Sequence, residues 1–301
     1  MTQTLQGIAP ISHLGVIRVQ GEDAASFLHG QLTNDFALLD LQHARLAAFC
    51  SAKGRMQASF IGFKRTPDEI LLICSRDLLA QTLKRLSMFV LRAKAKLSDA
   101  SNDFQLMGLV GDVVPNADQA PWTLHTAGEV HTVQLYPAAG QARALWVAPV
   151  GTPAPQAPAL TAEQWLWTEV ASGIATVSLP VYELFVPQML NYESVGGVNF
   201  KKGCYPGQEV VARSQFRGTL KRRAFIVHAD SALEAGAEVF ASSDAEQAAG
   251  TVVQAAPAPQ GGWDAIVSMQ ISAAEEVLTA GSATGPVLTL QALPYALLED
   301  I

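Results

Sequence analysis

Apolar residues recur along the first 110 positions in two patterns, one typical of strands and one typical of helices. Strand-like runs cover residues 14–19, 45–50, 57–63, 69–74 and 104–110. Residues 24–28 and 78–91 instead carry apolar side chains at helical spacing. Residues 51–54 separate two of the strands, and Gly54 can adopt the positive φ that a tight hairpin turn requires. Strands mixed with a few helices predict an α+β fold.

The second half of the chain begins with a breaker-rich stretch and ends in short alternating runs. Residues 115–160 are rich in Ala, Pro and Gly, and 149–160 are typical of a linker. Thr161 is positioned to cap the next helix, with Gln164 as its capping-box partner. Short alternating runs separated by glycine turns follow residue 224 and favour a small barrel or sandwich. We therefore predict a region 1–223 of two interwoven subdomains, joined near 149–160, and an all-β barrel at 224–301.

Composition places the chain among folded proteins of a reducing compartment. Hydrophobic residues make up 49% of the 301 positions and charged residues 16%, so a sizeable core is expected. No apolar run is long enough to cross a bilayer, and the N-terminus lacks the pattern of a secretory signal. The three cysteines lie far apart, which argues against a disulfide framework and a CxxC metal site. We expect a cytoplasmic protein with no membrane partner.

Positive charge is concentrated in one segment although the net charge is -7. Residues 201–223 hold 7 of the 20 basic residues and a single acid, Glu209. A solvated charged face is the common outcome for such a run. Because glycines and a cysteine are interleaved with the cations, we favour an anion-binding site. The acidic total means that any contact with tRNA is local or indirect.

The same segment presents a cysteine in a glycine-jointed loop. Pro206-Gly207 is a type II turn signal, which keeps Cys204 and Tyr205 out of regular structure. Gln208 then begins a helix whose free N–H groups face the turn. Nearby cations and this helix N-terminus would favour the thiolate and lower the pKa of Cys204, making it reactive or ligating. The alternative is a buried, inert cysteine, the role we assign to the remaining two, Cys50 and Cys74.

Several motifs support a family resemblance that spans nearly the whole chain. The string from Lys202 to Glu209, Lys-Gly-Cys-Tyr-Pro-Gly-Gln-Glu, resembles the signature of the YgfZ family of folate-binding proteins. Further matches are FLHGQLTND at 27–35, CSAKGR at 50–55, PQMLN at 187–191 and LPYAL at 293–297. The family is similar in fold to the T-protein of the glycine cleavage system, an aminomethyltransferase that uses tetrahydrofolate. The resemblance is weakest over 100–160.

The resemblance implies a fold, a cofactor and a cellular role. It implies T-protein-like folate-binding domains with mixed or antiparallel sheets, a central cavity for tetrahydrofolate or a derivative, and the C-terminal barrel. It also implies support for the iron–sulfur enzymes that methylthiolate tRNA. Trp165 matches a folate-contacting tryptophan of the family, although core packing explains it nearly as well. With it, the predicted binding residues are Lys53, Arg55, Asn191, Lys202, Tyr205, Gln208, Glu209 and Arg213.

Two departures from the family relatives matter for chemistry. The T-protein needs an aspartate after its hairpin glycine, and residues 54–59 of this chain contain no acid. Aminomethyl transfer by that route is therefore disfavoured. Some family members also place a tryptophan where this chain has Leu14, so one stacking surface is absent.

These observations leave three functional hypotheses. We favour a folate-binding assembly factor for iron–sulfur proteins, with tRNA-methylthiolating enzymes as client partners. In it, Cys204 faces the folate cavity or its rim and acts as a transient cluster ligand, a nucleophile or a redox-sensitive group. Cations such as Lys53, Arg55, Lys202 or Arg213 would meet the glutamate tail of the folate. The rivals are a folate-dependent one-carbon transferase and a tRNA-binding module.

Overall fold

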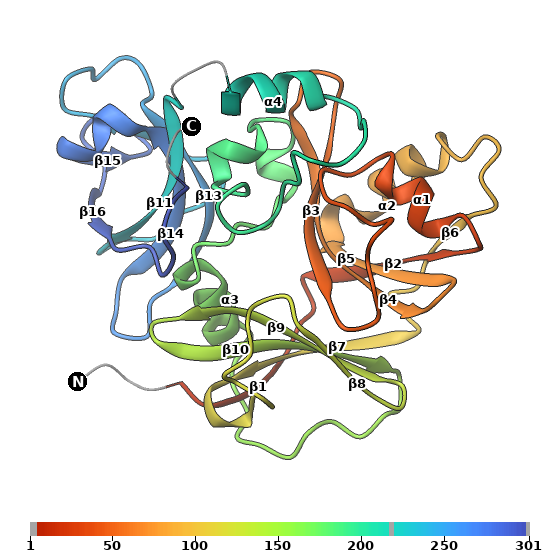
Figure 1. The fold of residues 1–301 in the computed structure, drawn as a ribbon. Coiled ribbons are helices and arrows are strands. Elements are labelled where there is room, and N and C mark those ends of the chain that lie inside the picture. The colour runs from red at the N-terminus through yellow and green to blue at the C-terminus, as the bar shows by residue number, and fades with distance from the viewer. Residues whose placement is uncertain (1–4, 217–219, 299–301) are drawn as a thin grey trace.

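Two five-stranded sheets and a closed barrel form the protein, which we describe from a computed structural model. The structure describes residues 5–216 and 220–298; Arg217, counted above in the basic segment, lies outside them. In Figure 1 the barrel and the two sheets occupy three corners, with α3 and α4 lying between them. The predicted α+β class is confirmed, and every pair of neighbouring strands in the sheets is antiparallel.

The first sheet contains the hairpin that the sequence predicted. Its spatial order is β3 (Ala44–Cys50), β4 (Met56–Thr66), β5 (Glu69–Ser75), β2 (Leu14–Gln20) and β6 (Lys96–Asp99). Gly54 has a φ of 71° in the turn between β3 and β4, as expected. Two helices accompany this sheet, α1 (Ala24–His29) and α2 (Arg76–Ser87). The apolar pattern that predicted a helix to residue 91 thus overestimated α2 by one turn.

The second sheet includes strands that the sequence pattern did not predict. Its order is β1 (Gly7–Pro10), β7 (Phe104–Val110), β10 (Gln141–Pro149), β9 (Val130–Ala138) and β8 (Leu124–Ala127). Three of these strands lie inside the stretch rich in Ala, Pro and Gly. Residues 150–160 contain no strand or helix of more than one residue and lead to α3 (Ala162–Ala171).

The C-terminal part is the predicted barrel. Its closed order is β11 (Arg222–Ala229), β14 (Trp263–Gln270), β13 (Gly250–Pro257), β12 (Glu238–Ala241), β15 (Leu278–Ala280) and β16 (Val287–Gln291). The segment before it holds α4 (Gln208–Phe216), together with short 3-10 turns at Leu179–Val181 and Pro187–Leu190. Two more 3-10 turns occur at Gly111–Val113 and Ile271–Glu275.

One hydrophobic core joins all three parts. Its buried side chains include Leu46 from the first sheet, Leu145 from the second and Ile266 from the barrel, with Trp165 and Trp167 of α3 among them. Helix α3 therefore packs between the sheets and the barrel. This position makes α3 the element best placed to build a site at the centre of the molecule.

Candidate functional site

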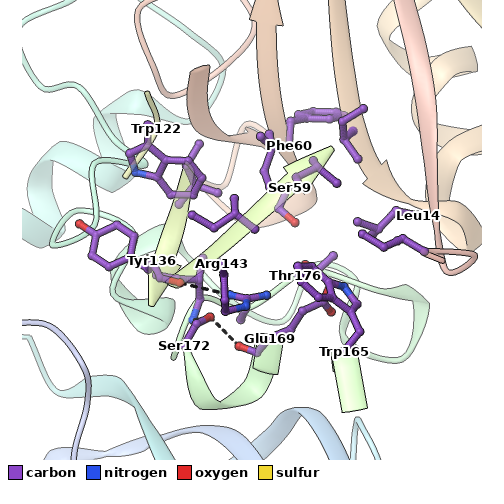
Figure 2. A pocket seen from close by; sticks show the side chains of 18 of the residues that line it. Leu14, Ser59, Phe60, Trp122, Tyr136, Arg143, Trp165, Glu169, Ser172 and Thr176 are labelled. Atoms are coloured by element: carbon purple, nitrogen blue, oxygen red, sulfur yellow. Dashed lines mark hydrogen bonds between the residues drawn. The ribbon is translucent and has the colours of Figure 1, made fainter. Parts of the chain in front are cut away.

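A narrow cavity lies at the centre of the molecule, between the two five-stranded sheets and α3 (Figure 2). The volume of the cavity is about 50 Å³. Most lining residues are apolar or aromatic, as is usual for small-molecule sites. The lining residues include Leu14, Tyr136, Arg143, Trp165 and Glu169.

Helix α3 supplies the cavity with two side chains from one face. Thr161 and Gln164 form the predicted capping box, which fixes where the helix begins. Trp165 and Glu169 follow one turn apart and line the cavity together. A Cβ placed on Gly108 of β7 would lie 2.1 Å from Cε3 of Trp165, so the indole can approach the sheet only over a glycine.

Glu169 is a buried carboxylate held by three donors. The indole Nε1 of Trp165 donates to its Oε1 at 2.8 Å, and Gln254 of β13 donates to its Oε2 at 2.9 Å. The Nε2 of His13 lies 3.0 Å from Oε1 and 3.1 Å from Oε2. Burial opposes the charge on both groups, but their mutual attraction outweighs it. The pKa of His13 is therefore raised and the pKa of Glu169 is lowered.

Arg143 of β10 brings a cation into the same cavity. Its Nε donates to Thr168 Oγ1 at 2.9 Å, and its guanidinium carbon lies 4.6 Å from the centre of the Trp165 ring. Burial lowers the pKa of Arg143 to about 10, against the opposing effect of the nearby Glu169 charge. Arg143 therefore remains protonated at neutral pH. The cavity combines a cation, an anion and an aromatic face within one small space.

The loop that carries the signature motif lies against the tip of the first-sheet hairpin. Gly207 has a φ of 80°, and a Cβ placed there would lie 2.4 Å from the carbonyl oxygen of Ser51. Helix α4 begins directly afterwards at Gln208, as predicted. Cys204 is exposed in this loop, and it is not among the residues that line the central cavity. The expected role of this cysteine at the cavity or its rim remains a prediction.

Lys202 and Tyr205, the neighbours of Cys204 in the motif, point into the protein. The Nζ of Lys202 donates to the carbonyl oxygen of His29 and, at 2.9 Å, to that of Leu32, and it lies 4.7 Å from the centre of the Tyr205 ring. Burial lowers the pKa of Lys202 to about 8, opposed by the nearby Asp35 and Cys204. Burial likewise raises the pKa of Tyr205. Both side chains anchor the loop in the position that presents Cys204.

The other predicted binding residues are spread over the surface and the packing around the loop. Asn191 donates to the Ala224 carbonyl at 2.8 Å and accepts from the Ala224 N–H at 3.2 Å, which joins the PQMLN motif to the barrel. Arg55 donates to the carbonyl oxygen of Leu184. Gln208 is half-buried and Lys53 is exposed. Glu209 and Arg213 form an exposed ion pair of 3.3 Å on α4.

Trp165 is thus the predicted site residue that lines the central cavity, and Leu14 lines it too. Arg143, Glu169 and His13 were not predicted. The available signal was a single charged residue inside an otherwise apolar element, Arg143 in ARALWV and Glu169 in WLWTEV. Such residues are costly to bury unless they are paired or bind something.

Across residues 5–216 and 220–298, no group of three or more His, Cys, Asp or Glu side chains is arranged to hold a metal ion. Over the same residues, no helix is both long enough and apolar enough to cross a membrane.

Cys50 and Cys74 are buried, and burial raises the pKa of each thiol to about 12, in agreement with a packing role.

The fold of the chain is T-protein-like. The chain is similar to the glycine cleavage system aminomethyltransferase T of Bartonella henselae, with a TM-score of 0.65 and 15% identity over 97% of this chain and 87% of that one. At this identity the likeness concerns the fold alone. No family model matches the chain.

Curated relatives give the family. The chain is 30% identical to the tRNA-modifying protein YgfZ of Edwardsiella ictaluri, over 93% of this chain and 89% of the relative. It is also 30% identical to the protein of the same name from Photorhabdus laumondii, over 95% and 91% of the two chains. The chain therefore belongs to the YgfZ family, and the resemblance predicted from its motifs is confirmed.

Proposed function

We propose that this protein acts in tRNA modification, as a cytoplasmic, folate-binding accessory factor for the iron–sulfur enzymes that methylthiolate tRNA. The names of its curated relatives support the role in tRNA modification. The observation that supports a bound folate is the central cavity, where Trp165 offers an aromatic face beside two buried charges. A pteridine ring combines a flat π surface with hydrogen-bonding edges, and these groups suit both features.

The cavity residues fit such a ligand by their chemistry, and the fit requires movement. A bicyclic ring needs more room than the roughly 50 Å³ that water can reach, so lining side chains must shift on binding. Trp165 would stack on the ring, and Arg143 and Glu169 would orient its polar edge. Tetrahydrofolate, when bound, supplies a reduced one-carbon carrier. The residues of this chain hold it in place and keep water away from its ring.

The proposed contact with iron–sulfur clients uses a different surface. Cys204 is exposed, and the buried Lys202 ties its loop to the carbonyls of His29 and Leu32 and contacts the Tyr205 ring. One thiolate cannot hold a cluster, so the client protein would supply most of the ligands. In this proposal Cys204 contributes a single soft ligand at the contact, and the folate cavity lies in the interior of the same molecule.

Thermal unfolding tests the folate part directly. A ligand that binds only the folded state raises the melting temperature in proportion to the logarithm of its concentration over its dissociation constant. We expect tetrahydrofolate to stabilise the wild type, and Trp165→Phe to weaken the effect. Trp146→Phe, on a buried tryptophan outside the cavity, is the matched control. A wild type that shows no shift at millimolar tetrahydrofolate would remove folate from the proposal.

The role of Cys204 is tested in cells. In a strain that lacks the protein, we expect Cys204→Ala to fail to restore the methylthiolated nucleosides of tRNA, measured by mass spectrometry. Tetrahydrofolate binding by the purified variant should persist, because the side chain is exposed and does not line the cavity. Full restoration by the variant would eliminate the cysteine from the mechanism.

One-carbon transfer is the less favoured function. Among the residues that line the cavity, the only carboxylate is Glu169, and both of its oxygens already accept hydrogen bonds from protein donors. Such a group is poorly placed to take a proton from a folate amine. Turnover of methyltetrahydrofolate by the pure protein would reverse this preference.

A further inference from the structure

Arg143 is a cation inside the central cavity with few protein acceptors. Arg143 as a residue is 3% exposed, yet only two acceptors contact its side chain in the described part of the chain. One is Thr168 Oγ1 at 2.9 Å, and the other is the Tyr136 carbonyl at a long 3.4 Å. A guanidinium carries five N–H donors, so most of them lack a protein partner. Figure 2 shows the guanidinium within the group of side chains that surround the cavity.

The neighbouring carboxylate does not neutralise this cation through a direct contact. Among the described residues, no carboxylate oxygen lies within 4.0 Å of the Arg143 guanidinium nitrogens. Glu169 instead accepts from Trp165, His13 and Gln254, two donors on each oxygen. A buried charge without a partner is destabilising. Its presence in the lining of a cavity is best explained by an acceptor that arrives with the ligand.

We propose that Arg143 donates to a ring oxygen of the bound heterocycle, so that the cavity selects 4-oxo pteridines over 4-amino pteridines. This inference rests on the proposed folate-binding function and specifies how the ring is recognised. In a 2-amino-4-oxo pteridine, the oxygen at position 4 accepts the guanidinium N–H. A 2,4-diamino pteridine has an amino group at that position. The amino group is a donor, and the guanidinium N–H groups cannot accept from it, so the hydrogen bond is lost.

The location of Arg143 favours recognition of the ring over recognition of the flexible tail. The guanidinium carbon lies over the Trp165 ring, 4.6 Å from its centre, so a heterocycle bound in the cavity beside this tryptophan brings its edge close to the cation.

Calorimetric titration with two matched ligands tests the proposal. The probes are 6-methylpterin and 2,4-diamino-6-methylpteridine, which differ at position 4 and have no tail. At pH 8 we expect the wild type to bind the oxo compound at least about tenfold more tightly, the usual effect of one unmet buried hydrogen bond. Arg143→Met should bring the ratio of the two affinities close to one. Arg143→Lys keeps the positive charge but lacks the planar set of guanidinium donors, and it should give an intermediate ratio of the two affinities.

The control variant is Arg92→Met, which removes an exposed arginine that does not line the cavity and should leave the ratio unchanged. The ratio is measured within each variant, so a general loss of stability does not imitate the effect. Equal affinities in the wild type, or full selectivity in Arg143→Met, would overturn the inference and leave folate binding intact. Binding of tetrahydrofolate but of neither tail-free ring would also overturn it. Absence of all binding by the wild type would overturn the proposed function as well.

Discussion

The indole N–H of Trp165 donates a 2.8 Å hydrogen bond to Glu169, one turn further along α3. This bond fixes the plane of the tryptophan that faces the cavity, and the same carboxylate accepts from His13 and Gln254. The aromatic wall of the cavity is therefore coupled to a charged pair, and through Gln254 to the barrel. Ligand binding and the protonation of this cluster should influence each other.

The His13–Glu169 pair should make stability depend on pH. Because the folded-state pKa of His13 is raised above 6.5, its contribution is complete below pH 6.5 and is lost as the pH rises through the raised value. The lowered pKa of Glu169 keeps that carboxylate charged throughout this range. His13→Gln retains a donor without the charge. We expect it to cost about 1 kcal/mol near pH 6 and less as the pH increases.

Urea unfolding of the wild type and His13→Gln between pH 5.5 and 9 measures this difference. His43→Gln is the control, since His43 and Asp40 form an exposed pair that contributes little to stability. A difference between wild type and His13→Gln that stays constant or grows towards high pH would contradict the coupling.

The turn at Gly207 should tolerate no side chain. Gly207 combines a φ of 80° with close approach to Ser51 and Gly54, where a Cβ would lie 2.4 Å and 2.7 Å from backbone atoms. Gly207→Ala should therefore reduce the free energy of unfolding by more than about 2 kcal/mol and displace the loop that presents Cys204. Chemical denaturation measures the effect.

Gly140→Ala is the matched control for that substitution. Gly140 has a similar φ of 76°, but a Cβ there would meet nothing within 4 Å. The Gly140→Ala variant should lose only about 1 kcal/mol of unfolding free energy, because glycine adopts this φ more easily than alanine does. Equal losses of unfolding free energy in Gly207→Ala and Gly140→Ala would show that the close contact between the loop and the hairpin does not contribute to stability.

Local chemistry made some of this structure predictable from sequence. The capping box at Thr161 and Gln164, and the turns at Gly54 and Gly207, depend on neighbours in the chain and were found where expected. The three strands β8, β9 and β10 were not, because their stretch is rich in Ala, Pro and Gly. These strands are stabilised by pairing with their neighbours, and β10 lies between β7 and β9. The periodicity of a sequence does not show which strands will pair.

The composition of the cavity was harder to predict for a related reason. Glu169 and His13 are 156 positions apart, and Arg143 and Trp165 come from different elements. The motif around Cys204 was conspicuous because its residues are consecutive, whereas the cavity is assembled from single residues distant in sequence. Lys202 illustrates a different case: the ligand contact expected from its place in a basic run stays a prediction, and the structure shows its Nζ donating to the carbonyl of Leu32.

Lys202 should stabilise the protein increasingly above pH 8. Its pKa is lowered to about 8 by burial, so between pH 8 and its ordinary value of 10.5 the unfolded chain binds a proton that the folded chain does not. The stability of the wild type should therefore rise over this range relative to Lys202→Met. At pH 7 the variant should already lose about 1 kcal/mol, because the carbonyls of His29 and Leu32 lose their donor.

Unfolding curves of both proteins from pH 7 to 10.5 give the comparison. Lys201→Met, at the exposed neighbouring position, should show no pH-dependent difference from the wild type. A loss in Lys202→Met that becomes smaller above pH 8 would mean that the lysine is not the buried, easily deprotonated group that its surroundings indicate.

Cys204 should be the one cysteine that an alkylating reagent reaches in the folded protein. Cys50 and Cys74 are buried with pKa values of about 12, so at pH 8 only about one thiol in ten thousand is ionised at each. Mass spectrometry after iodoacetamide treatment should show a single label on the native protein at Cys204, and three labels after denaturation. Native Cys204→Ala should take up none. Labelling of Cys50 or Cys74 as fast as Cys204 would mean that the strands carrying them open readily, and that the exposed loop is not the site of selective thiol chemistry.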